Sequence, residues 1–315
     1  MKQPIVVIEC VVYNHEKFLR ECLDSLVGQK TNFPFIVVAH DDKSTDSSAQ
    51  IILEYQEKYP DIVVPAIESE NQWSKKDGSL QRKIFEAVQA FHPKYVAICE
   101  GDDYWTDMKK LQKQYDILEK DDALMGVAAE SIVVDENSNL LRPKMTNQTE
   151  TRRYSLRDFF AENPLYPTAS VMWRNNHSED VERMFEYTIT QFVDDWNLWI
   201  AIHTFGDFLF LEDILVAYRI QANSITHTNS RIEREKASAE ICRKVADILP
   251  EEYADISEDL RNTNWVWISL IFAYRAEKMY AHMLWSIIVA SFLCPKSLWR
   301  TIKKRMISKN KKNTK

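Results

Sequence analysis

Strand-like and helix-like patterns alternate along the chain as far as Lys120. Ile5–Val12 is an apolar run rich in β-branched side chains, as expected for a strand buried on both faces. In Glu16–Val27 apolar residues recur at helical spacing, which predicts an amphipathic helix. The alternation then predicts further strands at Phe35–Ala39, Ile62–Ile67 and Tyr95–Cys99, and helices from Ser44 or Thr45 to Lys58, at Leu80–Phe91 and at Asp107–Lys120.

This order of elements predicts an α/β fold, with a mostly parallel sheet flanked by helices. Ligands of such sheets bind outside the carboxyl ends of the strands. A polar cluster follows each of the first four predicted strands. These clusters are Tyr13-Asn14-His15, His40-Asp41-Asp42, Glu68–Asn71 and Glu100–Asp103. We therefore expect a ligand site at this edge of the sheet.

The pattern changes after Leu124. Strands are predicted at Met125–Val134 and Thr168–Trp173, with a loop at Asp135–Arg153 between them. A helix at Asp195–Thr204 and short strands at Phe208–Leu211 and Ile214–Tyr218 follow, and the chain is mainly helical from Arg231. A polar stretch near Asn229 marks the boundary. We expect a catalytic domain at residues 1–228 and a helical C-terminal region with a basic tail at residues 229–315.

Composition narrows the function classes. The chain has 315 residues and only five glycines, and it contains neither GxGxxG nor GxxxxGK[ST], which disfavours dinucleotide and P-loop binding. The net charge is −7, but Lys296–Lys315 carries nine basic and no acidic residues, so the rest of the chain carries −16, the difference between −7 and +9. The acidic charge of residues 1–295 argues against nucleic-acid binding, whereas the basic tail could bind an anionic surface.

The cysteines and the N-terminus indicate a cytoplasmic protein. The cysteines are odd in number and scattered without zinc-type spacing, so we expect reduced, buried thiols at Cys10, Cys22, Cys99, Cys242 and Cys294. The start, Met1–Pro4, leads straight into an apolar strand and shows no separate secretory segment.

Paired carboxylates follow two of the predicted strands. Crowded carboxylates repel each other, and a divalent cation with its preference for oxygen ligands would relieve the repulsion. A Mg²⁺ or Mn²⁺ site that holds a diphosphate fits this pattern. The alternative is that Asp42 and Asp103 simply cap the helices that follow them.

Three acidic motifs resemble those of family 2 glycosyltransferases with the GT-A fold. Residues 41–46, DDKSTD, resemble the DDGSTD element, with Lys43 in place of glycine. Residues 99–105 resemble the CEGDDYW form of the DxD motif, which is typical of a bacterial subgroup. Residues 194–199, DDWNLW, resemble the later motif that carries the catalytic base. The resemblance covers residues 4 to 228 and supports the same α/β fold.

The resemblance implies roles at the nucleotide. An aspartate of the pair after the second strand would bind the nucleobase, with Asp42 preferred over Asp41. Tyr13 and Asn14 would line the base and ribose pocket. Arg82 lies where the family often has a basic residue directed toward the diphosphate.

The resemblance also implies roles at the sugar and the metal. Glu100, Asp102 and Asp103 would contact the nucleotide sugar. Asp102 would ligate Mn²⁺ or Mg²⁺, and Glu100 would lie nearer the sugar or ribose. Asp195 would be the general base, with Asp194 as the second candidate. The alternative is that Asp195 only caps the N-terminus of the helix that follows it.

Two further positions are open. After Tyr218-Arg219 the family often has a histidine two residues on, where this chain has Gln221. His227 either replaces that histidine or lies in a solvent-exposed loop. Trp73 either stacks on a sugar or base or is an ordinary surface aromatic.

The implied function is inverting, metal-dependent transfer of a sugar from a nucleotide sugar to an acceptor hydroxyl, in the synthesis of a bacterial surface polysaccharide such as capsule or O-antigen. UDP is the default nucleotide and dTDP stays open. The acceptor would be a sugar or a lipid-linked oligosaccharide. The alternatives are an inactive GT-A scaffold that binds a partner glycosyltransferase, and a nucleotidyltransferase. The latter would need a Gly- and Arg/Lys-rich loop after the first strand, which Val11–His15 does not provide.

The C-terminal region adds a membrane hypothesis. The apolar segments Trp265–Tyr280 and Met283–Cys294 precede Pro295 and the basic tail. The second segment is short of the roughly 20 residues needed to span a bilayer. We expect it to lie on the anionic cytoplasmic face of a membrane. The alternative is packing on the catalytic domain or on a twin subunit.

Overall fold

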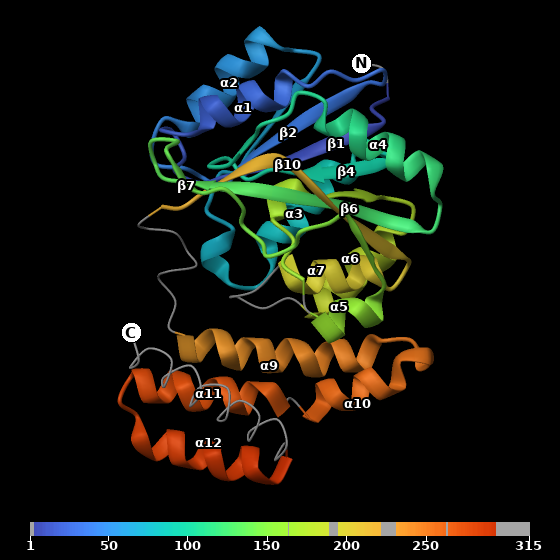
Figure 1. Cartoon of the computed structure of the whole chain (residues 1–315). Helices are drawn as coiled ribbons and strands as arrows, with labels where there is room; N and C mark the ends of the chain where they lie inside the picture. Colours follow the sequence, from blue (N-terminus) through green and yellow to red (C-terminus); the bar gives the residue numbers. More distant parts are fainter. Residues whose placement is uncertain (1–2, 163, 189–194, 222–230, 263, 294–315) are drawn as a thin grey trace. The chain divides into compact units, whose positions relative to one another are not determined.

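The computed structural model describes residues 3–162, 164–188, 195–221, 231–262 and 264–293 (Figure 1). The chain divides into two compact units. The first comprises Met1–Gln191 with Asp195–Ser224, and the second Phe192–Asp194 with Ile225–Lys315. The described part of the first unit holds the sheet, and the described part of the second is helical.

One ten-stranded sheet runs through the described part of the first unit. Its main path has the order β3-β2-β1-β4-β9-β6-β10-β5, and two further strands, β7 and β8, pair with β6 and β10. The strands are β1 (Val6–Val12), β2 (Phe35–Asp41), β3 (Val63–Ile67), β4 (Tyr95–Ile98), β5 (Tyr104–Trp105), β6 (Leu124–Val134), β7 (Leu140–Arg142), β8 (Arg152–Tyr154), β9 (Met172–Arg174) and β10 (Asp207–Arg219).

The pairing confirms the predicted α/β class with a mostly parallel sheet. β1 pairs in parallel with β2 and with β4, β2 pairs in parallel with β3, and β6 pairs in parallel with β10. β9 is antiparallel to both of its neighbours, β4 and β6. The chain moves from β1 to β2 on one side and returns to β4 on the other. The topological switch point, where ligands of such sheets bind, therefore lies at the carboxyl ends of β1 and β4.

Helices cover both faces of the sheet. Figure 1 shows α1, α2 and α4 on one face and α3, α6 and α7 on the other. Apolar side chains of α1, α2 and α4 share one buried cluster with alternate residues of β1, namely Val6, Ile8, Cys10 and Val12. The helices of this unit are α1 (Leu19–Val27), α2 (Ser48–Lys58), α3 (Ser79–Gln89), α4 (Lys110–Lys120), α5 (Leu156–Glu162), α6 (Ser178–Thr188) and α7 (Asp195–His203).

Several boundaries differ from the predicted ones. α2 begins at Ser48 rather than at Ser44 or Thr45, because Ser44 and Thr45 hydrogen-bond to the loop after β1 instead of capping a helix. The two short strands predicted between Phe208 and Tyr218 are one strand, β10, with register shifts near Ile214.

Other elements of the first unit were missed or misplaced. The strand predicted from Thr168 starts only at Met172, after a 3₁₀ turn, η2 (Thr168–Ser170). The predicted loop Asp135–Arg153 contains β7 and the start of β8. Helices α5 and α6 were not predicted.

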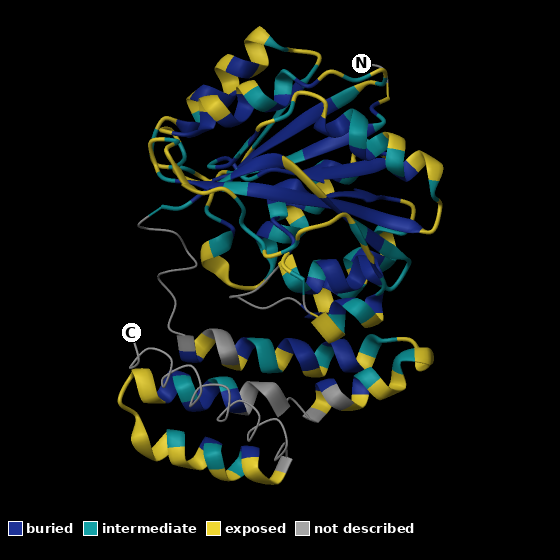
Figure 2. Cartoon of the chain, in the orientation of Figure 1, coloured by how far each residue is buried: buried dark blue, intermediate teal, exposed yellow. Residues whose placement is uncertain are grey.

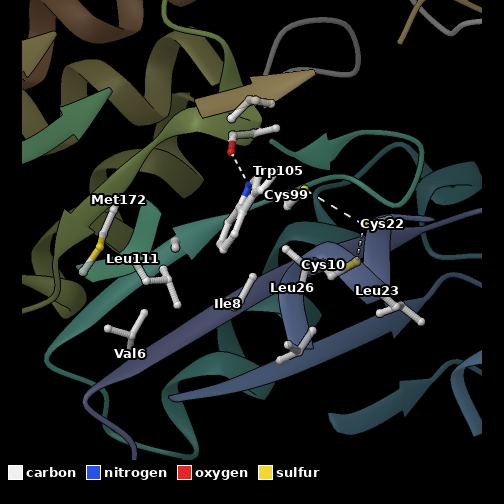
Figure 3. Packing of buried hydrophobic residues seen from close by; sticks show 14 of the residues in the cluster. Val6, Ile8, Cys10, Cys22, Leu23, Leu26, Cys99, Trp105, Leu111 and Met172 are labelled. Atoms are coloured by element: carbon white, nitrogen blue, oxygen red, sulfur yellow. Dashed lines mark hydrogen bonds between the residues drawn. The ribbon is translucent and has the colours of Figure 1, made fainter. Parts of the chain in front are cut away.

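The core beneath the switch point holds three thiols (Figure 3). The Sγ atom of Cys22 lies 3.9 Å from that of Cys10 and 4.0 Å from that of Cys99. These three and Cys242 are buried and form no disulfide within the described part of the chain, as predicted, whereas Cys294 lies outside the described residues. The thiols of Cys10 and Cys99, and then burial, raise the pKa of the Cys22 thiol, and burial raises the pKa of the Cys99 thiol to about 11, so both are protonated, apolar fillers of the core.

The same core contains a fully buried lysine. The Lys110 Nζ atom donates a hydrogen bond of 2.8 Å to Gln114 Oε1 and lies 4.0 Å from the centre of the Trp105 ring. Gln114 in turn donates to the carbonyl oxygens of Val127 and Ser170. Desolvation lowers the pKa of Lys110 from 10.5 to about 7. The charged form is therefore held at a cost to stability.

In the second unit the described residues are almost entirely helical, as predicted from Arg231 onward. Among the helices that the structure describes, none combines the length and apolar character needed to cross a membrane. The elements are α9 (Arg231–Ile248), the 3₁₀ turn η3 (Glu251–Tyr253), α10 (Ala254–Asn262), α11 (Asn264–Ala276) and α12 (Tyr280–Leu293).

We predict that Lys110→Met stabilises the protein in a pH-dependent way. Below pH ~7 Lys110 is protonated in both the folded and the unfolded state, so the cost of burying its charge is fully present. As the pH rises toward the pKa of the unfolded state, Lys110 loses its proton first in the folded state, and the cost decreases. The gain in the free energy of unfolding should be largest near about pH 6, at most about 5 kcal/mol, and small near about pH 10. Urea unfolding across pH measures it.

Lys109→Met is the matched control, because the Lys109 side chain is exposed one position earlier. It should change stability little at any pH. A Lys110→Met gain that is constant across pH would contradict the electrostatic explanation and would indicate a packing effect.

Candidate active site

The loops after β1 and β2 are tied to each other by Asn14. Its Oδ1 atom accepts a hydrogen bond of 2.7 Å from the Thr45 backbone N–H, and its own N–H donates to Ser44 Oγ at 2.9 Å. Both Asn14 and Lys43 have a positive φ, 56° and 62°. Lys43 thus occupies a left-handed conformation, which explains why the resembling motif has glycine there. Tyr13, 43% exposed, remains open to a ligand.

The two aspartates after β2 differ in how far they are engaged. Both carboxylate oxygens of Asp42 accept backbone N–H groups, from Gln72 at 2.6 Å and from Trp73 at 3.0 Å. Asp41 accepts the Ser44 N–H through Oδ2, and its Oδ1 atom is buried without a partner among the described residues. Asp41 therefore offers the open acceptor at this position, although the sequence favoured Asp42.

A tight loop after β4 carries the next three acidic residues. The Gly101 N–H donates to the Val11 carbonyl oxygen at 2.9 Å, which fixes the loop against the end of β1. A Cβ atom on Gly101 would lie 2.8 Å from His15 Nδ1 and 2.9 Å from Val12 Cγ2, so this close approach requires glycine. The loop can therefore present Glu100 on one side of the glycine and Asp102 on the other.

The acidic side chains of this loop have different partners. Asp103 is buried and accepts the Arg219 backbone N–H at 2.8 Å, and Asp102 Oδ2 accepts a hydrogen bond of 2.6 Å from Gln221 Nε2. Glu100 Oε2 is buried without a partner in the described part of the chain. Gln221, which stands where the family often has histidine, thus reaches the DxD aspartate directly.

Negative charges from distant segments converge here. Burial, together with the charges of Asp102, Asp195 and Glu9, raises the pKa of Glu100 to about 8. Burial also raises the pKa of Asp103, with Asp102 and Glu100 as the next causes, and raises the pKa of Glu9 to about 7. The carboxylates of Asp102 and Asp195 therefore both act on Glu100.

Asp195 begins α7 and is held by two contacts. Its Oδ1 atom accepts the Trp196 backbone N–H at 2.8 Å, and its Oδ2 atom accepts from Thr168 Oγ1 at 3.3 Å. The side chain reaches solvent, yet the surrounding protein removes part of its water and raises its pKa. A fixed carboxylate with raised proton affinity can act as a general base.

Sequence reasoning missed two side chains at the end of β10. Burial, together with the charges of Asp103, Glu100, Asp102 and Asp195, raises the pKa of Tyr218 to about 12, so this phenol lies within electrostatic range of the acidic group. Arg219 follows it directly. Local sequence offered no signal for either residue beyond the strand pattern itself.

Arg219 anchors the acidic loop to its surroundings. Its side chain is 1% exposed and donates from Nε to the Asp102 carbonyl oxygen at 2.8 Å, and from Nη2 to Glu21 Oε2 at 2.6 Å. Its Nη1 atom donates to the Asp135 carbonyl oxygen and to Ser138 Oγ, at 3.0 and 3.1 Å. One guanidinium therefore joins the DxD loop, α1 and the turn after β6.

Other predicted residues lie away from these contacts or outside the described residues. Arg82, on α3, has a 41% exposed side chain and pairs with Asp77 at 3.8 Å and Glu186 at 4.0 Å. Trp73 is half-buried and fixed through its backbone by Asp42. Asp194 and His227 lie outside the described residues. Within the described part, no group of three or more His, Cys, Asp or Glu side chains is arranged to hold a metal ion.

The acidic motifs and their sheet edge match a known family. Residues 8–206 match the model of glycosyl transferase family 2, which spans more than half of the chain. The chain belongs to glycosyl transferase family 2. This match agrees with the resemblance of the three acidic motifs.

Relatives of this chain come from several lineages. A Mycobacterium tuberculosis protein is 29% identical over 221 residues, which are 70% of this chain and 60% of that protein. The chain thus spans about 60% of the length of such mycobacterial relatives. The poly(ribitol-phosphate) beta-glucosyltransferase of Bacillus spizizenii is 38% identical over 96 residues, 30% of this chain and 14% of that protein.

Solved structures share the fold. Residues 1–349 of S. aureus TarS in complex with UDP-GlcNAc give a TM-score of 0.59 at 16% identity, with 91% of each chain covered. The mannosyltransferase PcManGT of Pyrobaculum calidifontis in complex with GDP-Man and Mn²⁺ gives 0.55 at 18% identity, with 100% of this chain and 88% of that chain covered. At these identities the likeness establishes the GT-A fold.

We predict that Arg219→Met destabilises the folded protein. The substitution removes a buried cation and leaves Glu21 and two carbonyl oxygens without their donor. Hydrogen bonds of a charged group contribute roughly 1.5–3 kcal/mol each, and the Glu21 side chain, 44% exposed, can regain water, so we expect a loss of about 3 kcal/mol. Urea unfolding measures the loss. Arg183→Met, at a 79% exposed side chain, is the control, and an equal effect of both substitutions would contradict the anchoring role.

Proposed function

We propose that the chain is an inverting, metal-dependent glycosyltransferase that moves a sugar from a nucleotide sugar, a UDP-sugar by default, to an acceptor hydroxyl. The observation that carries the proposal is the convergence of Glu100, Asp102 and Asp103 with Asp195 at one sheet edge of a family 2 fold. We assign the transfer to residues 1–228, and the enzyme to the CEGDDYW-type bacterial subgroup with hexosyl or N-acetylhexosaminyl specificity.

The nucleotide would bind at the carboxyl ends of β1 and β2. The Oδ1 atom of Asp41, which has no partner among the described residues, can accept a nucleobase N–H. Asp42 holds the backbone of residues 72–73 beside the carboxyl end of β2. Tyr13 is free to cover the base, and Asn14 fixes the loop that would border the ribose. The fold neighbours were solved with UDP-GlcNAc and with GDP-Man, which supports a nucleotide-sugar donor.

The donor set fits a divalent cation. Mg²⁺ and Mn²⁺ are usually held by one or two carboxylates together with substrate phosphates, so a preformed cage of three side chains is not required. Burial is the main cause of the raised pKa of Glu100, and the charge of Asp102 is the next; a cation would relieve this second, repulsive contribution. We assign Asp102 as the direct protein ligand. When bound, the ion supplies positive charge to the leaving diphosphate.

The remaining roles fall to residues of this chain. Asp195 takes the proton from the acceptor hydroxyl as its oxygen attacks the anomeric carbon and the nucleoside diphosphate leaves. A single base with direct displacement inverts the anomeric configuration. Thr168 and the Trp196 N–H hold the base in position. Arg82 would turn from its exposed partners, Asp77 and Glu186, toward the diphosphate.

The biological setting is a surface polysaccharide. A relative that is a poly(ribitol-phosphate) beta-glucosyltransferase supports a polymeric acceptor. We propose a sugar or lipid-linked oligosaccharide as the acceptor, and a place in the cytoplasm that includes the inner face of the membrane.

We predict that Asp102→Asn weakens metal-dependent donor binding. Purified protein is incubated with a panel of nucleotide sugars and Mn²⁺ or Mg²⁺, and thermal stability is recorded. One donor should raise Tm in the presence of metal, and Asp102→Asn should weaken this binding more than about 10-fold because a charged ligand is lost. Asp122→Asn, at a 98% exposed side chain, is the matched control. No response to any nucleotide sugar would favour the scaffold alternative.

We predict that Asp195→Asn separates chemistry from binding. Loss of a general base should lower the rate of donor hydrolysis or transfer by about 10²- to 10⁴-fold, while donor-induced stabilisation stays unchanged. Nuclear magnetic resonance of the first product formed by the wild type should show the inverted anomer. A retained anomer, or wild-type turnover by Asp195→Asn, would refute the assigned base.

A further inference from the structure

Helix α12 is apolar on every side, yet only part of it is covered. Tyr280–Leu293 contains no Asp, Glu, Lys or Arg. Its inner side contributes Ala290, Met283 and Ile287 to a cluster with Ile268 and Ile271 of α11. A helix that is apolar all round is normally buried all round. The opposite side of α12 therefore needs an explanation.

The opposite side is exposed to solvent in the second unit (Figure 2). Its large side chains follow helical spacing and form what we call the α12 outer face. Their exposed fractions are 58% for Tyr280, 57% for Leu284, 62% for Trp285, 50% for Ile288 and 83% for Phe292. Contiguous exposed apolar surface of this kind marks a contact site for a protein or a membrane.

The sequence that follows α12 indicates which partner covers this face. Residues 296–315 carry nine basic side chains and no acidic one, whereas the rest of the chain has a net charge of −16. An apolar helix face with aromatic residues, followed in the sequence by a cluster of Lys and Arg, matches the chemistry of an anionic lipid bilayer. Such a bilayer has an apolar interior beneath a negatively charged surface.

We propose that the α12 outer face and the basic segment 296–315 dock this enzyme on an anionic lipid bilayer, with α12 lying in the plane of the interface. α12 has 14 residues, a length of about 21 Å, which is too short to cross the ~30 Å hydrocarbon core. The inference deepens the proposed location of the enzyme. It does not depend on sugar transfer, because lipid binding is measured without a donor.

The test is flotation of the full chain with vesicles of phosphatidylcholine, with or without phosphatidylglycerol. One variant combines Leu284→Ser, Trp285→Ser and Phe292→Ser. A second combines Lys303→Gln, Lys304→Gln and Arg305→Gln. The control variant combines Leu140→Ser and Leu141→Ser, which are 60% and 52% exposed on β7.

The wild type and the control should bind vesicles that contain phosphatidylglycerol and bind phosphatidylcholine weakly. The face variant should lose more than about 10-fold in affinity through lost apolar burial. The charge variant should lose on the order of 100-fold, on anionic vesicles only and less at high salt.

Donor-induced stabilisation should persist in both variants, so a failure of docking and a failure of the proposed function are distinguishable. Wild-type vesicle binding by the face variant would overturn the proposal. So would a change from dimer to monomer in that variant, measured by light scattering, because a second copy would then be what covers α12.

Discussion

A buried guanidinium holds together the part of the molecule where its negative charges meet. Arg219 lies at the end of the last strand of the sheet and bonds to the DxD loop, to Glu21 of α1 and to the turn at Asp135. Those three segments are distant in sequence, and the loop they surround carries mutually repelling carboxylates. A fixed cation with several donors suits this task better than lysine, because its planar fork bonds in several directions at once.

The sheet order determines which segments Arg219 can join. β10 runs parallel to β6 and pairs with β5, the short strand directly after the DxD loop, so Arg219 arrives beside Asp103. The apolar runs of β1, β2, β4 and β6 made most of this fold predictable, since these strands are almost entirely buried. The start of α2 was not predictable, because Ser44 and Thr45 look like helix caps locally and are used by Asn14, thirty residues earlier, instead.

Much the same division applies to the candidate site. Clusters at strand ends and three acidic motifs predicted Asp42, with Asp41 as the second choice, together with Asp102 and Asp195, and these roles stay predictions. Tyr218 and Arg219 could not be predicted in this way, since a tyrosine and an arginine at a strand end are common in sequences. Their position near the acidic residues depends on the placement of β10 beside the DxD loop. Helix α12 is a related case: hydropathy showed an apolar segment, and only packing against α11 separated its covered side from its exposed one.

The two DD pairs follow one physical logic. In each pair one carboxylate stabilises the backbone and the other keeps acceptor capacity: Asp42 binds two backbone N–H groups beside the partly open Asp41, and buried Asp103 binds the Arg219 N–H beside the less buried Asp102. A carboxylate saturated by backbone donors is a poor ligand but a rigid support. A preorganised site must hold its functional groups within a fraction of an ångström. An acidic residue that stabilises the backbone, next to one that keeps acceptor capacity, meets this requirement. Repetition of this arrangement at two strand ends argues that the paired carboxylates are a division of labour within the site, and not a surplus of negative charge.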